Sequence, residues 1–141
     1  MNSIITYEIV REESTEETNN AYFGSFIPGE TVDMHIRIWN NKFGQEDVDN
    51  LSNAIMKISF NDFENKSYFD ILKVSVQHDA YITPERIDDI AVIQLGTIYG
   101  HKNIGSLSDI ENYKEVKIRI GPLYENSIEG LKNLSISVVS Q

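Results

Sequence analysis

The sequence predicts an all-β protein, an antiparallel sandwich of about seven or eight strands with one or two short helical turns. Short segments of alternating apolar and polar residues recur along the chain, turn residues separate them, and no long amphipathic helix is visible. Because alternation gives each strand one apolar face, two sheets must cover each other's apolar faces. A jelly roll, which is also built from two sheets, is the alternative.

The clearest predicted strand runs from Val32 to Trp39. Turn residues precede it at 28–31 and follow it at Asn40-Asn41. Strict alternation between these turns predicts two faces, because successive side chains of a strand point to opposite sides. The core face consists of Val32, Met34, Ile36 and Ile38, and the outer face consists of Asp33, His35, Arg37 and Trp39.

Six further segments have the alternation or the β-branched enrichment of strands. They span residues 3–10, 54–60, 68–76, 91–95, 116–120 and 134–138. The acidic segment 11–17 is expected to be a solvated loop.

Two short helical turns are predicted between these strands. Thr83-Pro84 places a capping residue before a proline at the first helical position, which predicts a turn over 85–89. Ser108 and Glu111 have the spacing of a capping box at the head of a second turn.

Composition predicts one domain over residues 1–141 and limits its chemistry. The chain has no cysteine, so disulfides, thiolate metal sites and cysteine nucleophiles are excluded. Its net charge of -10 and its scattered lysines disfavour nucleic acid as a partner. We find neither a secretory signal nor an apolar run of the roughly 20 residues that a spanning helix needs, so we expect no membrane insertion and synthesis in the cytoplasm.

Three segments resemble the immunoglobulin-like modules of bacterial adhesins and of phage head and tail proteins. They are the Gly29–Ile38 strand with its Asn40-Asn41 turn, the segment Tyr113–Ile118 and the terminal strand 131–139. The antibody pattern of paired cysteines around a core tryptophan is absent. The resemblance implies a sandwich without catalytic residues.

The sequence offers no catalytic or cofactor-binding motif, and its metal candidates are confined to one loop. His35, His78 and His101 lack the spacing of a zinc site, and no nucleophile elbow or nucleotide-binding loop is present. Calcium prefers several oxygens from one flexible loop, which makes the polar loop 43–53 the place to look. Its candidate ligands are Glu46, Asp47, Asp49 and Asn50. A solvated acidic loop is the alternative.

Exposed aromatic residues offer the most plausible binding function, because aromatic rings anchor many protein and sugar contacts. The candidate partner-binding residues are Trp39, Arg37, His35 and Tyr22. Tyr22 shares a glycine-containing segment with Phe23 and Phe26, which we instead expect to cover the core.

These observations lead to two functional hypotheses and no enzyme. The first is a structural protein of a phage virion, such as a head decoration or a tail protein, assembled in the host cytoplasm. Its partners would be other virion subunits, and it could be a homo-oligomer. The alternative is a cell-surface adhesion or carbohydrate-binding module of a larger secreted protein.

Overall fold

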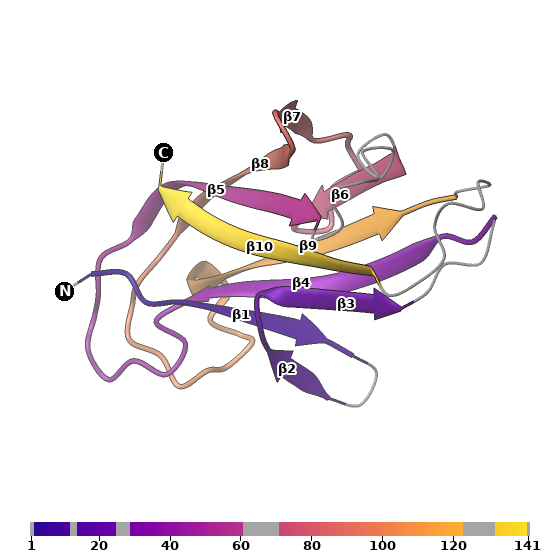
Figure 1. The fold of residues 1–141 in the computed structure, drawn as a ribbon. Coiled ribbons are helices and arrows are strands. Elements are labelled where there is room, and N and C mark those ends of the chain that lie inside the picture. Colours follow the sequence, from indigo (N-terminus) through magenta and orange to yellow (C-terminus); the bar gives the residue numbers. More distant parts are fainter. Residues whose placement is uncertain (1, 12–13, 25–28, 61–70, 123–131, 141) are drawn as a thin grey trace.

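The computed structural model describes residues 2–11, 14–24, 29–60, 71–122 and 132–140. It is a sandwich of two antiparallel sheets, shown in Figure 1, and therefore confirms the predicted all-β fold class. These described ranges contain ten strands, against about seven or eight predicted for the chain. No helix in these ranges is long and apolar enough to cross a membrane.

Each sheet has five strands. Sheet 1 has the order β2 (Thr15–Glu17), β1 (Ile5–Val10), β4 (Val32–Asn40), β9 (Tyr113–Ile120) and β6 (Leu72–Val76). Sheet 2 has the order β3 (Asn20–Gly24), β10 (Lys132–Ser140), β5 (Leu51–Phe60), β8 (Ile90–Ile98) and β7 (Glu85–Ile87). A 3-10 turn, η2 (Ile110–Asn112), precedes β9.

The core lies between the sheets and is built mainly from isoleucine, leucine and valine. In β4, Met34, Ile36 and Ile38 are buried and Val32 packs against them partly buried, so the predicted core face of this strand is confirmed. Fully burying a side chain of this kind stabilises the fold by roughly 1.5 to 3 kcal/mol relative to leaving it exposed to water. The opposite sheet supplies matching residues from β5, β8 and β10.

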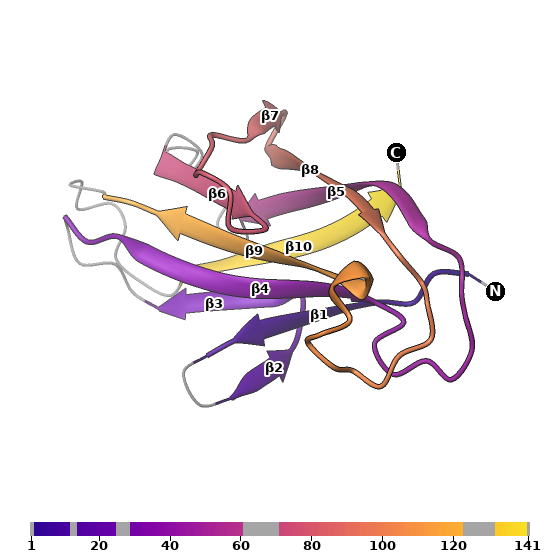
Figure 2. The same ribbon diagram turned by 180° about the vertical axis from the view of Figure 1, so that it is seen from behind.

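The chain passes from one sheet to the other at nearly every connection (Figures 1 and 2). The exceptions among the described elements are the hairpins β1–β2 and β7–β8. In the immunoglobulin order, by contrast, strands D and E, and strands F and G, are neighbours in both chain and sheet. The strand order of this sandwich therefore differs from the immunoglobulin order.

The helical turn predicted over 85–89 is wrong, because these residues begin a hairpin. Glu85–Ile87 forms β7 and pairs with Ile90–Val92 of β8. Asp88 between them has φ 54°, a left-handed conformation that aspartate tolerates and a helix does not use. The chain therefore reverses at Asp88 instead of winding into a turn.

The expected loop over 11–17 contains a short strand. Thr15–Glu17 forms β2 and pairs with Glu8–Val10, while residues 12 and 13 lie outside the described ranges. The second predicted helical turn is present as η2, although its N-cap residue Asp109 makes no side-chain capping hydrogen bond. Of the strand predicted over 68–76, the part from Leu72 is confirmed and residues 68–70 lie outside the described ranges.

Candidate functional site

The outer face of sheet 1 carries cross-strand rows of polar side chains. Asp33, His35 and Arg37 of β4 are paired in register with Arg119, Lys117 and Glu115 of β9. Directly opposed residues of an antiparallel pair are within reach of each other, so opposite charges can bond across the strands. The predicted outward register of the three β4 residues is therefore correct. Many side chains of this face, however, bond to one another.

A charge network of Glu8, Arg37, Lys42 and Glu115 occupies the row nearest the end of β4. Arg37 donates from Nη1 to Glu8 Oε1 at 2.7 Å and from Nε to Glu115 Oε1 at 3.1 Å. Lys42 donates to the second oxygen of Glu8. The side chains of Arg37 and Glu8 are only 13% and 4% exposed. Arg37 is thus committed to this network, which leaves little of it for a partner.

The acids of the charge network are held ionised. Burial raises the pKa of Glu8, but hydrogen bonds from Lys42 and Arg37 outweigh it, so the pKa lies below its ordinary value. Burial likewise raises the pKa of Glu115, and the hydrogen bond from Arg37 with the neighbouring histidines brings it below the ordinary value.

Two histidines face the carboxylate of Glu115. His78 Nε2 lies 2.7 Å from Oε2, and His35 Nε2 lies 3.6 Å from Oε1. Burial lowers the pKa of His35 more than Glu115 raises it, and Arg37 and Lys117 lower it further. His35 is therefore neutral at physiological pH in the isolated chain.

The row at the other end of the face is an exposed pair. Arg119 donates to both oxygens of Asp33, at 2.8 and 3.1 Å, and its guanidinium lies 4.2 Å from the centre of the Tyr81 ring. Hydrogen bonding to Asp33 raises the pKa of Arg119 above its ordinary value.

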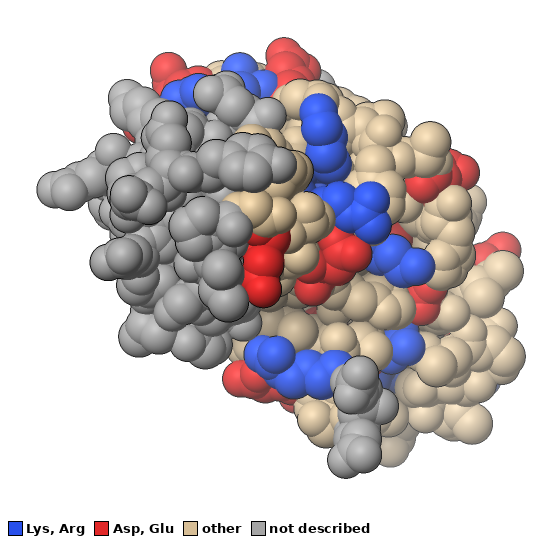
Figure 3. Space-filling model, turned by 90° about the vertical axis from the view of Figure 1, so that its right-hand side faces the viewer, with Lys and Arg blue, Asp and Glu red and all other residues tan. Residues whose placement is uncertain are grey.

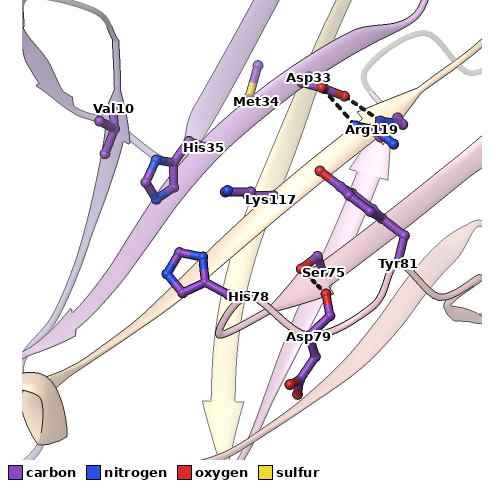
Figure 4. Close-up of a pocket in the computed structure, with 10 residues that line it drawn as sticks. All are labelled: Val10, Asp33, Met34, His35, Ser75, His78, Asp79, Tyr81, Lys117 and Arg119. Carbon is purple, nitrogen blue, oxygen red and sulfur yellow. Dashed lines mark hydrogen bonds and ion pairs between the residues drawn. The ribbon is translucent and has the colours of Figure 1, made fainter.

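A shallow pocket of about 510 Å³ lies between these two rows, and Figure 4 shows its lining. His35 comes from β4, Ser75 from β6, Lys117 from β9, and His78 from the turn after β6. The remaining lining residues are Val10, Asp33, Met34, Asp79, Tyr81 and Arg119.

This pocket is not a serine hydrolase site, although Ser75, His78 and Asp79 all line it. The Ser75 hydroxyl donates to the backbone carbonyl of Asp79 at 2.6 Å, and His78 is engaged by Glu115. A catalytic triad needs the serine to donate to the histidine and the histidine to an aspartate.

Trp39 is not exposed, which corrects the prediction that it binds a partner. It lies in the predicted outward register, but its side chain is 0% exposed. The Tyr113 ring packs on it with centroids 4.6 Å apart, and the Lys42 ammonium lies 5.3 Å from its centre. The loop that follows β4 folds back over the end of this strand. The alternation pattern therefore predicts the correct face of the sheet for Trp39 but not the burial of its side chain.

The loop end, defined as residues 41–50 and 99–112, is held together by buried asparagines. Asn40, Asn41 and Asn112 are almost completely buried. Asn112 Nδ2 donates to the carbonyls of Asn40, Tyr99 and His101 at 2.7 to 3.2 Å. An amide with two donors and an acceptor can satisfy backbone groups that have no sheet partner.

Asn40 and Asn41 tie the same loops from the other side. Asn40 Nδ2 donates to the carbonyls of Asp49 and Ile98, and Asn41 Nδ2 donates to those of Glu46 and Gly100. Asn41 has φ 61°, which asparagine adopts more readily than most residues. The Asn40-Asn41 pair, which the sequence indicates only as a turn, is therefore the anchor of the loop end.

The calcium candidates belong to this hydrogen-bonded loop. Asp47 Oδ1 accepts from the backbone amide of Lys102, and the backbone carbonyls of Glu46 and Asp49 accept from Asn41 and Asn40. Asn50 Oδ1 accepts from the amide of Gly100. In the described part of the chain, no group of three or more acidic or histidine side chains is placed to hold an ion.

Apolar side chains point outward from the loop end. Phe43 is 68% exposed and Ile104 is 84% exposed, and together they line a mainly apolar hollow of about 600 Å³. The Phe43 ring rests on Gly105, where an added Cβ would lie 2.2 Å from Cε1. Leu107 and Ile110 of the same loops are exposed as well. No local pattern in the sequence indicates this surface, because its residues come from two loops far apart in the chain.

Tyr22, the remaining candidate, lies in β3 and pairs with Asn133 of β10. Its side chain and residues 25–28 lie outside the described part of the structure.

On the side of the molecule shown in Figure 3, basic and acidic side chains lie next to one another.

Comparisons of the chain with models of protein families, with curated proteins and with solved structures find no match.

Proposed function

We propose that this chain is a non-catalytic structural or binding protein that docks onto other proteins through its loop end. Its setting would be a phage particle, where it would serve as a head decoration or tail protein. Its partners there would be other virion subunits and further copies of itself. The single observation that carries the docking role is the exposure of Phe43 and Ile104 on loops that buried asparagines hold in place.

Rigid loops make this surface suitable for binding. Association costs conformational freedom, and a surface that is already ordered loses less of it. Large apolar side chains surrounded by polar groups are typical anchors of protein interfaces. The polar surroundings here are Gln45, Lys102 and Asn103, which line the same hollow.

The virion setting is supported by the resemblance to phage head and tail modules and by the sandwich architecture that such modules share. A particle subunit must present one surface repeatedly to identical neighbours, and a rigid loop end could supply that surface. Assembly would take place in the host cytoplasm.

The test replaces the gene for this chain with variant genes in a strain that carries it. The double variant Phe43→Ser with Ile104→Ser should remain folded but be lost from purified particles, as measured by mass spectrometry of the particle proteins. Ile87→Ser, which alters an exposed apolar residue on β7, is the control and should leave particle content unchanged. Absence of the unaltered chain from particles would refute the virion proposal.

The exposed ring of Phe43 is the observation that favours the alternative, a cell-surface or carbohydrate-binding module, because sugars stack on aromatic faces. That alternative predicts binding of the purified chain to a glycan array and its loss in Phe43→Ser. No glycan binding, together with presence on particles, would decide for the virion.

A further inference from the structure

We propose that the pocket between β4, β9 and the turn after β6 binds an oxyanion, a phosphate or a carboxylate group. Lys117 would be its permanent cation, and His35 and His78 line the pocket beside it. This site is separate from the loop end and does not depend on the docking function proposed above.

The first argument is the state of Lys117. Its side chain lines the pocket, and among the residues that the structure describes it has no ion pair and no hydrogen bond. Figure 4 shows the side chain of Lys117 reaching toward the space between the imidazole rings of His35 and His78. An ammonium group has three donors and no acceptor, so this group is ready to bind an anion.

The acids around the pocket are largely engaged elsewhere. Asp33 is held by both donors of Arg119, and Glu115 accepts from Arg37 and lies outside the lining. The Asp79 carboxylate points away from Lys117 in Figure 4. The charge of Lys117 is therefore not neutralised inside the pocket, even though the chain as a whole carries a net charge of -10.

The second argument is the hydrogen-bond arrangement of His78. Because the Glu115 carboxylate can only accept, the Nε2 of His78 at 2.7 Å must be the donor. This hydrogen bond fixes the His78 ring at the edge of the pocket, which it lines together with Lys117.

Anion binding should be coupled to proton uptake by His35. Burial and its cationic neighbours keep this imidazole neutral when no anion is bound. A bound anion reverses part of that effect, since a nearby negative charge favours the protonated imidazole. The charged or titratable groups facing the two histidines are Glu8 on β1, Asp33 and Arg37 on β4, Glu115, Lys117 and Arg119 on β9, and Asp79 and Tyr81 after β6.

The experiment titrates the full chain with inorganic phosphate and, separately, with sodium acetate while the imidazole resonances are followed by NMR. Measurements at about pH 6 and about pH 8 bracket the ordinary titration range of histidine. Acetate keeps its charge across this range, so a pH dependence seen with acetate comes from the protein. The probe that binds more tightly identifies a phosphate or a carboxylate as the preferred group.

We expect saturable shifts of the His35 and His78 resonances, with tighter binding at the lower pH. Lys117→Met should weaken binding by about tenfold, the loss that one charge-assisted hydrogen bond would give. The control is Lys57→Met, an exposed lysine on β5 of the other sheet, and it should bind as the unaltered chain does.

His35→Gln cannot titrate, so it should bind acetate with a weaker dependence on pH. An unchanged pH dependence in this variant would refute the role of His35. Absence of saturable shifts with both probes, or equal losses in the Lys117 and Lys57 variants, would overturn the site itself.

Discussion

Asn112 donates a hydrogen bond from Nδ2 to the backbone carbonyl of Asn40, 3.2 Å away, although 72 positions separate the two residues in the sequence. The contact joins the end of β4 to η2, and the same amide also reaches Tyr99 and His101. Two loops that share no strand pairing are thereby fixed to one another.

Replacing this amide should destabilise the protein markedly. Asn112→Ala removes the side-chain donor to the carbonyls of Asn40 and Tyr99, and we expect a loss of about 2 kcal/mol in the free energy of unfolding. Urea denaturation measures it. Gln45→Ala removes an exposed amide from the same loop end and should change stability by less than about 0.5 kcal/mol. Similar losses in both variants would show that the buried amide has no special role.

The two arginines on the outer face of sheet 1 should differ in their contribution. Arg37→Met leaves the buried Glu8 and the partly buried Glu115 with fewer counter-charges, and we expect a loss of about 3 kcal/mol in the free energy of unfolding. Arg119→Met removes an ion pair with Asp33 that is exposed to solvent, so it should lower stability far less than Arg37→Met does. Comparable unfolding midpoints for the two variants would contradict the burial of the charge network.

Stability should fall on acidification in two stages. The pKa of His35 lies below 6.5 in the folded chain, so the unfolded chain binds more protons and stability decreases as the pH falls from about 6.5. The pKa values of Glu8 and Glu115 lie below 4.5, so a second decrease follows as the pH falls below that value.

The free energy of unfolding measured against pH checks both stages. His35→Gln cannot titrate and should show a smaller first decrease while keeping the second. A first stage of the same size in this variant would exclude His35 as its origin.

The fluorescence of Trp39 tests whether its side chain is buried. It is the one tryptophan of the chain and its side chain is fully buried, so acrylamide should quench its fluorescence far less in the native protein than in urea. Equal quenching in both states would mean that the loop does not cover the strand end.

The elements that the sequence predicts well are those with one buried face. In β4 the alternation identifies Met34, Ile36 and Ile38 as core, because each apolar side chain points between the sheets. The strands it misses, β2, β3 and β7, all lie at sheet edges. Every residue of β2 and β7 is exposed, so these strands are held by backbone pairing, which leaves no hydrophobic pattern in the sequence.

The candidate site was less predictable than the fold. His35 and Arg37 are correctly placed on the outer face, but their partners Glu115 and Glu8 come from other strands and no local spacing indicates them. Trp39 shows the same limit, since what buries it is the loop after β4 and the ring of Tyr113. The alternation of apolar residues and the turn residues at its ends describe one strand at a time. The contacts described above depend instead on the register between strands.

The position of β10 between β3 and β5 has a consequence for synthesis of the chain. Residues 20–24 and 51–60 are made early, yet the strand that joins them spans 132–140. While that strand is still inside the ribosome, β3 has no neighbour and one flank of β5 is open. We therefore expect sheet 2 to close only after residues 132–140 have left the ribosome, and until then its unpaired edges are the part of the molecule most exposed to aggregation.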